Sequence, residues 1–261
     1  MMNENYSHYY SLLRKTAIEA GEKILEIRND KLGVTIKNDN SPVTLADQTA
    51  EKIILRDLNI IAPEIPVIAE ESASEGNIPD VKDKFWLVDP LDGTKEFIAG
   101  GTDFTVNIAL IENGVPTFGI IYTPATRRLY TAVSQNEATL QIVDQQLKPG
   151  PEMNIRVRDG DINNLTALAS KSHLDEETKA FLDDLNITDK TSAGSSMKFC
   201  VVAEGKADIY PRFGPTMEWD IAAGHAILSA AGGSVKNPDG TTFEYNKPGY
   251  RNGPFIARGN I

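Results

Sequence analysis

The most informative stretch of this chain reads Phe85-Trp86-Leu87-Val88-Asp89-Pro90-Leu91-Asp92-Gly93-Thr94, an apolar run that passes directly into a polar turn. The apolar run is typical of a buried strand, and Pro90 predicts that the strand ends there. Proline and glycine force a turn, so the carboxylates of Asp89 and Asp92 can share one small volume. Grouped carboxylates suit Mg²⁺, which also accepts water and phosphate oxygens as ligands. A plain β-turn is the alternative, because the same residue types are common in turns.

Four further acidic residues stand at the predicted ends or beginnings of elements. Glu70 and Glu71 follow the short apolar run 67–69. Neighbouring side chains on a strand point to opposite faces, so at most one of the two is expected in a site. The alternative is that both are solvated residues at the end of a strand. Asp220 precedes the helical run 221–231, where capping the helix is the alternative to binding a metal and phosphate. Asp47 follows Thr44 by three residues, which is the spacing of a capping box. Capping of the predicted helix is therefore the alternative to a role for Asp47 in a site.

The rest of the chain alternates helical and strand patterns. Helices are predicted at 6–28, from 44 to the prolines at 63 and 66, and at 175–185, 196–203 and 221–231, and strands at 67–69, 85–88, 105–111, 117–122, 129–133, 165–169 and 207–210. The polar, turn-rich segment 141–151 predicts a boundary between two halves, 1–150 and 151–261. This mixture indicates layered α and β elements around mixed sheets, an α/β (α+β) fold.

Composition excludes several classes of protein. The 261 residues include 26 Lys and Arg against 37 Asp and Glu, a net charge of −11 that disfavours binding to a nucleic acid polymer. The single cysteine, Cys200, excludes an intrachain disulfide and is expected in the core. No apolar stretch approaches the roughly 20 residues of a membrane span, and no signal peptide is recognised. We therefore expect a cytoplasmic protein, with loose attachment to the inner face of a membrane left open.

Three separated motifs occur in a distinctive order: Glu70-Glu71, Trp86 to Thr94, and Trp219-Asp220. Together they resemble the inositol monophosphatase superfamily of Mg²⁺-dependent, lithium-inhibited phosphatases. Within it, the chain is most similar to the bacterial 3′(2′),5′-bisphosphate nucleotidases. The supporting segments are 39–44, 91–97, 104–110, 194–200, 202–205 and 210–216. The resemblance implies a layered α-β-α-β-α sandwich of the inositol monophosphatase and sugar phosphatase type, with the active site between the two halves.

The resemblance also implies roles for individual residues. Two or three Mg²⁺ ions would be held by Glu70, Asp89, Asp92, Asp220 and the backbone carbonyl of Leu91, and Li⁺ would inhibit. Asp47 and Thr94 would be the catalytic residues that orient and activate the attacking water. The substrate would contact Glu70, Leu91, Asp92, Gly93, Thr94 and Asp220, together with the positions similar to nucleotide contacts, His173, Ser195, Lys198 and Arg212.

These residue assignments suit removal of the 3′-phosphate from adenosine 3′,5′-bisphosphate, which gives AMP and phosphate. The sulfated form of this nucleotide is expected as a second substrate. The resemblance implies that the protein recycles the by-product of sulfate assimilation. The second phosphate needs cations, for which Lys198 and Arg212 are the candidates. Inositol phosphatases place a carboxylate near this arginine, and none occurs here between Asp208 and Glu218. The alternatives are inositol monophosphatase or fructose-1,6-bisphosphatase activity, or a non-catalytic metal- or nucleotide-binding regulator. A monomer is slightly favoured over an oligomer.

Overall fold

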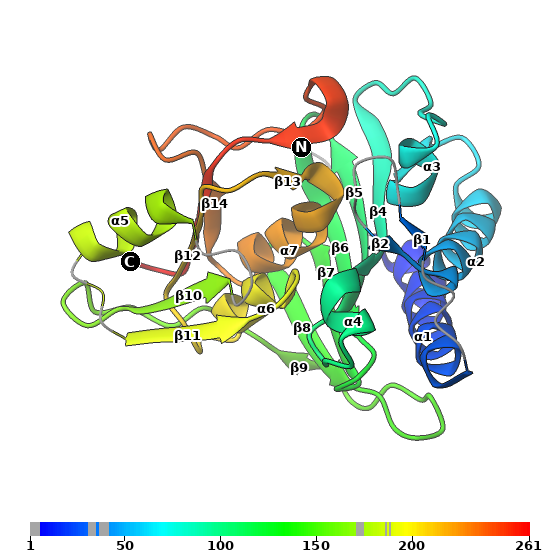
Figure 1. Cartoon of the computed structure of the whole chain (residues 1–261), viewed down its shortest axis with the longest axis horizontal. Helices are drawn as coiled ribbons and strands as arrows, with labels where there is room; N and C mark the ends of the chain where they lie inside the picture. Colours follow the sequence, from blue (N-terminus) through cyan, green and yellow to red (C-terminus); the bar gives the residue numbers. More distant parts are fainter. Residues whose placement is uncertain (1–5, 31–34, 37–41, 171–174, 186, 188) are drawn as a thin grey trace.

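The computed structural model describes residues 6–30, 35–36, 42–170, 175–185, 187 and 189–261. Within these ranges the chain forms two main sheets, with strand orders β3-β4-β5-β6-β7-β8-β9 and β11-β10-β12-β16-β14. Helices separate the sheets and cover their outer faces, so the layers alternate as α-β-α-β-α (Figure 1). The layered sandwich expected from the sequence is confirmed.

The larger sheet is antiparallel except for its first pair, β3 and β4, which run parallel. Its strands are β3 (Val67–Ala69), β4 (Lys84–Asp92), β5 (Thr105–Glu112), β6 (Val115–Thr123), β7 (Arg128–Ser134), β8 (Glu137–Ile142) and β9 (Met153–Asn154). Helices α1 (Ser7–Asp30) and α2 (Leu45–Ile61) cover one face, and α6 (Met197–Ala203) and α7 (Glu218–Ala230) pack on the other (Figure 1).

Alternation along the central strands divides the core between these two faces. Phe85 and Leu87 of β4 belong to the cluster that contains α6 and α7, while Trp86 and Val88 belong to the cluster that contains α1 and α2. A strand buried on both faces reads as a continuous apolar run, which is why the sequence predicted β4 so clearly. The strand ends that carry acidic residues are thereby anchored in two cores.

The smaller sheet consists of β10 (Thr166–Ser170), β11 (Asp189–Ala193), β12 (Ile209–Arg212), β14 (Ser234–Lys236) and β16 (Phe255–Arg258). Helix α5 (Glu176–Asp184) packs on its outer side over a small apolar cluster. The remaining elements are β1 (Thr35–Ile36) paired with β2 (Pro42–Val43), α3 (Glu70–Ser74), α4 (Thr94–Ile98), β13 (Thr216–Met217) paired with β15 (Arg251–Asn252), and a 3₁₀ turn at Pro248–Tyr250. None of the helices in the described ranges is both long and apolar enough to cross a membrane.

The predictions about strands were wrong at Pro90 and incomplete, because β8, β9, β11, β14 and β16 of the two main sheets were not predicted. Pro90 does not end β4, which continues to Asp92 with an irregular register between Asp89 and Asp92. Proline has no N–H to donate, so the ladder is interrupted there while the chain direction is kept. The polar strand β11 was not predicted, because its largely exposed residues at a sheet edge lack the apolar pattern of a strand.

Candidate active site

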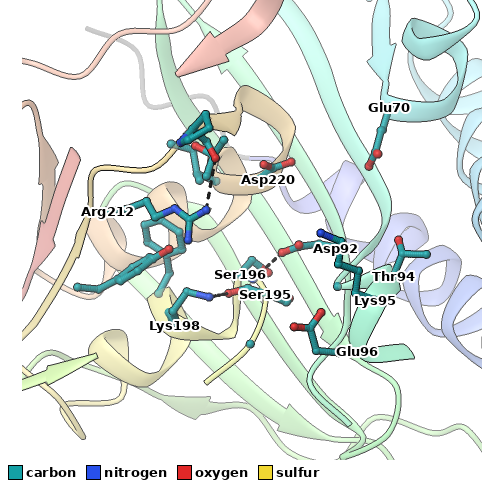
Figure 2. Close-up of a pocket in the computed structure, with 17 residues that line it drawn as sticks. Glu70, Asp92, Thr94, Lys95, Glu96, Ser195, Ser196, Lys198, Arg212 and Asp220 are labelled. Atoms are coloured by element: carbon teal, nitrogen blue, oxygen red, sulfur yellow. Dashed lines mark hydrogen bonds between the residues drawn. The ribbon is translucent and has the colours of Figure 1, made fainter. Parts of the chain in front are cut away.

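A cavity of about 240 Å³ is lined by residues from the ranges 70–96 and 194–221 (Figure 2). The predicted site residues that line it are Glu70, Asp92, Gly93, Thr94, Ser195, Lys198, Arg212 and Asp220. They come from the start of α3, the end of β4 and the turn into α4, the loop before α6 and its first turn, the end of β12, and the first turn of α7. The structure therefore brings together residues from all three sequence motifs. His173 lies outside the described residues.

The acidic wall of the cavity consists of Glu70, Asp92 and Asp220, with Asp89 nearly fully buried, at 1% exposure, among them. Burial, and then repulsion from the other three carboxylates, raises the pKa of Asp89 well above its usual range. The pKa of Asp220 is raised in the same way, by burial and then by Asp92 and Glu70. Four carboxylates that repel one another in a poorly solvated place form a strong cation-attracting field.

The donor set fits magnesium. Figure 2 shows the Glu70 carboxylate pointing into the cavity toward the side where Asp92 and Asp220 lie. Among the residues that the structure describes, no three acidic, histidine or cysteine side chains lie close enough together to hold a metal ion by themselves. The carboxylates instead frame a volume, and Mg²⁺ typically keeps several waters and binds through few carboxylates and a substrate phosphate. The all-oxygen chemistry of this wall therefore suits Mg²⁺ better than a metal that needs a nitrogen or sulfur cage.

The turn after β4 brings Thr94 to Asp47. The Thr94 hydroxyl lies 3.0 Å from Asp47 Oδ1 and 3.0 Å from the Leu91 carbonyl oxygen. Asp47 Oδ2 accepts hydrogen bonds from the backbone N–H and hydroxyl of Thr44, at 2.7 and 2.5 Å, which confirms the predicted capping box of α2. Asp47 thus caps its own helix and contacts Thr94 at once, so the two interpretations of this residue are compatible.

Gly93 is required at this turn by its backbone. Its φ of +93° is a conformation that side chains disfavour, and a Cβ there would lie 2.6 Å from the Asp103 carbonyl oxygen. The Leu91 N–H donates to Asp89 Oδ1 at 3.0 Å, so the acidic turn is closed by its own backbone. The predicted turn geometry of this motif is thereby explained by specific contacts.

The loop before α6 is tied to the acidic wall. The Ser196 N–H donates to Asp92 Oδ2 at 2.6 Å, and the hydroxyls of Ser195 and Ser196 lie 2.7 and 2.8 Å from the Thr105 hydroxyl. Ser195 has a φ of +55°, a left-handed conformation that is uncommon for residues with a side chain. These bonds from β5 and Asp92 hold the strained loop against the acidic wall.

The basic wall faces the carboxylates across the cavity (Figure 2). Lys198 is only 5% exposed, and burial lowers the pKa of its ammonium group to about 8. Its Nζ donates to the Ser195 carbonyl oxygen at 2.7 Å. The Arg212 guanidinium donates to the carbonyl oxygens of Gly214 and Pro215 at 3.2 and 3.4 Å. These backbone contacts orient both cations.

The family model of the inositol monophosphatase family matches residues 5–258. The chain belongs to the inositol monophosphatase family. Its relatives include the 3′(2′),5′-bisphosphate nucleotidase CysQ of Shigella flexneri, 42% identical over 90% of this chain and 95% of that protein, and CysQ of Escherichia coli K12, 41% identical with the same coverage. A crystal structure of CysQ from Bacteroides thetaiotaomicron, 39% identical, superposes with a TM-score of 0.81 over 99% of this chain and 98% of that one.

Other members of the inositol monophosphatase family share the fold at lower identity. The IMPase of Thermotoga maritima is 22% identical and superposes with a TM-score of 0.77 over 97% of this chain and 92% of that one. At such a distance the likeness concerns the fold alone. The arrangement of layers is thus common to the family, whereas the residues of the basic wall must be judged from the site itself.

Sequence reasoning missed several residues of this family member's cavity. Lys95 and Glu96 line it directly after the acidic turn, and Tyr210 lines it two residues before Arg212. Their signal was present, since all three fall within segments that carried the family resemblance. Glu71 does not line the cavity, in agreement with the expectation that only one residue of its pair joins the site.

Proposed function

We propose that this chain is a Mg²⁺-dependent 3′(2′),5′-bisphosphate nucleotidase that converts adenosine 3′,5′-bisphosphate to AMP and phosphate, with the sulfated nucleotide as a second substrate. The observation that carries the proposal is a single cavity with carboxylates on one wall and buried or oriented cations on the other. A substrate with two separate phosphates matches such a cavity, because one phosphate meets the metal-binding wall and the other meets the cations. The names of the relatives support the same activity.

The residues that would hold Mg²⁺ are Glu70, Asp89, Asp92 and Asp220, with the Leu91 carbonyl oxygen. When bound there, the ions supply positive charge for the phosphate oxygens and the leaving oxygen and lower the pKa of a bound water. Burial and mutual repulsion raise the pKa of Asp89 and of Asp220, so a bound cation would stabilise the charged form of this wall. The buried Asp89 contributes charge rather than surface to the cavity.

The chain provides a route for orienting water and removing its proton. The Thr94 hydroxyl donates to Asp47 Oδ1, which leaves an oxygen lone pair to accept a hydrogen bond from a water. The water oxygen then forms a bond to phosphorus while the bond from phosphorus to the 3′-oxygen breaks, and the 3′-oxygen takes up a proton from solvent to become the 3′-hydroxyl of AMP. Asp47, held by Thr44, is the carboxylate toward which the water proton passes, through the Thr94 hydroxyl.

The basic wall would bind the phosphate that does not react. Lys198 makes no ion pair with a carboxylate among the described residues, and it donates only to backbone carbonyl oxygens. Ser195 lies beside it on the strained loop and Arg212 lies on the adjacent strand. No acidic residue occurs between Asp208 and Glu218 to hold sugar hydroxyls or repel that phosphate. This charge pattern favours a bisphosphate nucleotide over inositol phosphate.

Phosphate release from three substrates tests the proposal: adenosine 3′,5′-bisphosphate, inositol 1-phosphate and fructose 1,6-bisphosphate, each with Mg²⁺, with chelator and with added Li⁺. We expect the nucleotide to have the highest kcat/KM, no turnover without Mg²⁺, and inhibition by Li⁺. A higher kcat/KM for inositol 1-phosphate or fructose 1,6-bisphosphate would overturn the substrate assignment. Binding without turnover of any substrate would indicate a regulator instead.

We also infer a cytoplasmic role in recycling the by-product of sulfate assimilation, since that is where such a nucleotide would arise. A strain that lacks this protein should accumulate the bisphosphate nucleotide when grown on sulfate and lose this phenotype when cysteine is supplied. Equal nucleotide levels with and without the protein would contradict this role without touching the enzymatic assignment.

A further inference from the structure

Glu51 is a buried carboxylate of α2 that the mechanism above does not use. It is 5% exposed, and it faces the beginning of α3. Its Oε2 accepts a hydrogen bond from the Glu71 N–H at 2.8 Å, and its Oε1 accepts from the Ser72 N–H at 3.0 Å and the Ser72 hydroxyl at 2.5 Å. Three donors from one short segment therefore converge on this single side chain.

The contacts of Glu51 replace a missing helix cap. The first N–H groups of a helix have no partner within it, and a side chain at the N-cap position usually accepts from them. In α3 the N-cap residue is Ala69, whose side chain cannot do so. Glu51 supplies the acceptor from a different helix, and its negative charge also suits the positive end of the helix dipole. The first residue of this externally capped helix is Glu70, a proposed metal ligand.

Glu51 belongs to a pair of carboxylates on one face of α2. Asp47 and Glu51 are four residues apart, so both side chains project from the same side of the helix. Asp47 contacts Thr94 at the start of α4, and Glu51 contacts the start of α3. One rigid helix face thus touches both of the turns that carry the acidic wall and the proposed water-orienting hydroxyl.

No basic side chain accounts for the burial of Glu51. The ion pairs formed among the described residues do not include it. Within the described part of the chain, its hydrogen bonds come from the backbone amides and the hydroxyl at the start of α3. Burying a carboxylate costs folding free energy unless hydrogen bonds compensate for the lost hydration, and the three donors at the start of α3 provide those bonds. The geometry of three bonds aimed at the segment that begins with Glu70 therefore calls for a reason beyond ordinary core packing.

We propose that Glu51 is a positioning residue that fixes the place of Glu70 for metal binding. Glu51 caps α3 from α2 and so holds the start of α3 at a constant distance from Thr94. This inference rests on the proposed function, because it takes Glu70 as a magnesium ligand. Groups that orient a metal ligand typically change metal affinity about 10- to 100-fold when they are replaced.

The test compares four variants of the full chain: Glu51→Gln, Ser72→Ala, Glu70→Gln and Asp57→Asn. Asp57 is the matched control, because it is another buried carboxylate of α2 but accepts from Thr16 of α1, at 2.7 Å, away from the cavity. Mg²⁺ affinity is measured by calorimetry, and hydrogen exchange of the Glu71 and Ser72 amides is measured in metal-free protein. Thermal unfolding reports the general loss of stability in each variant.

We expect Glu51→Gln to weaken Mg²⁺ binding about 10-fold and Ser72→Ala about 2- to 3-fold, with faster exchange of the two amides in both. Asp57→Asn should lower the unfolding temperature and leave Mg²⁺ affinity and both amides unchanged. Mg²⁺ affinity of Glu51→Gln within twofold of wild type would overturn the inference, as would an equal loss in Asp57→Asn. If Glu51→Gln does not fold, unchanged affinity in Ser72→Ala overturns it.

Glu70→Gln separates this inference from the proposed function. If wild type binds Mg²⁺ and Glu70→Gln weakens that binding, the metal assignment stands and the result for Glu51→Gln decides the positioning role alone. If Glu70→Gln binds Mg²⁺ as wild type does, the assignment of Glu70 is wrong and the positioning role fails with it.

Discussion

The acidic wall of the cavity takes two of its four carboxylates from one short segment at the end of β4, whereas the basic wall takes single residues from two separate elements, Lys198 from the first turn of α6 and Arg212 from the end of β12. Asp89 and Asp92 share one turn that their own backbone closes. Lys198 and Arg212 are instead oriented by carbonyl oxygens of neighbouring loops. The acidic wall is therefore a local motif, and the basic wall exists only once the chain has folded.

The two walls also hold opposite electrostatic imbalances. Burial and mutual repulsion raise the pKa of Asp89 and Asp220, while burial lowers the pKa of Lys198 to about 8. Burial disfavours the charged form on both walls, and the charges that would stabilise the two walls further are of opposite sign. A metal ion at the acidic wall and a second phosphate at the basic wall would stabilise the charged forms of both walls. The charges of the cavity therefore suit a bisphosphate that binds together with metal ions.

The largest expected effect breaks the acidic wall. Asp89→Asn removes one buried charge while keeping the shape of the side chain, so we expect turnover of adenosine 3′,5′-bisphosphate to fall by on the order of 10³. The measurement is kcat at saturating Mg²⁺, with circular dichroism to confirm the fold. Asp83→Asn, an exposed aspartate just before β4, is the control and should keep full activity. Turnover like wild type in Asp89→Asn would remove this residue from the metal-binding wall.

A smaller effect breaks the basic wall selectively. Arg212→Ala should raise KM for adenosine 3′,5′-bisphosphate about 10- to 50-fold, because a hydrogen bond between charged groups is lost. Adenosine 3′-monophosphate has the same reacting phosphate but lacks the second one, so its KM should change little. The control is Arg156→Ala, at an exposed arginine outside the cavity. Equal changes in KM for both nucleotides would show that Arg212 does not bind the second phosphate.

A third effect sharpens the electrostatic contrast between the walls. In metal-free protein, Asp89→Asn should increase the free energy of unfolding by about 1–2 kcal/mol, because it relieves repulsion from Glu70, Asp92 and Asp220. The same variant that loses activity would then be the more stable one without Mg²⁺. Chemical denaturation with chelator and with Mg²⁺ measures this. A lower stability of the metal-free variant would show that repulsion in the acidic wall is already offset within the chain.

The contrast between the walls explains what the sequence could predict. The acidic turn was predicted because an apolar strand, a proline, a glycine and two aspartates lie next to one another, and short-range rules apply to them. The capping box of Thr44 and Asp47 and the burial of Cys200 were predicted for the same reason and are confirmed. The resemblance to the family then supplied the order of the motifs, which local rules do not contain.

What could not be predicted depends on contacts between distant segments. Pro90 was expected to end β4, but two packed faces carry the strand past it to Asp92. The role of Glu51 was not foreseen, because its partners at Glu71 and Ser72 lie in another helix and its own sequence reads as an ordinary helical position. Likewise, only the fold shows that the loop at Ser196 meets Asp92.

The smallest effect concerns a titratable group that belongs to neither wall. His225 lies on α7 beyond Asp220, with Nδ1 3.0 Å from the Tyr245 hydroxyl, and burial, followed by the Lys247 charge, lowers its pKa from 6.5 to about 3. Between pH 6.5 and about pH 3, His225 is protonated in the unfolded chain but neutral in the folded chain. Stability should therefore fall as pH falls below about 6.5, by up to roughly 1.4 kcal/mol per pH unit from this group.

Replacing His225 isolates that contribution from the carboxylates of the acidic wall. His225→Gln should flatten the slope of unfolding free energy against pH between pH 6 and pH 4, measured by denaturant titration in chelator, even though its absolute stability is lower. His8→Gln removes an exposed histidine of α1 and serves as the control, with a slope like that of wild type. Parallel slopes for His225→Gln and wild type would mean that the acid sensitivity of the fold arises elsewhere, and not from the repelling carboxylates of the cavity, whose raised pKa values make the folded state gain stability as pH falls.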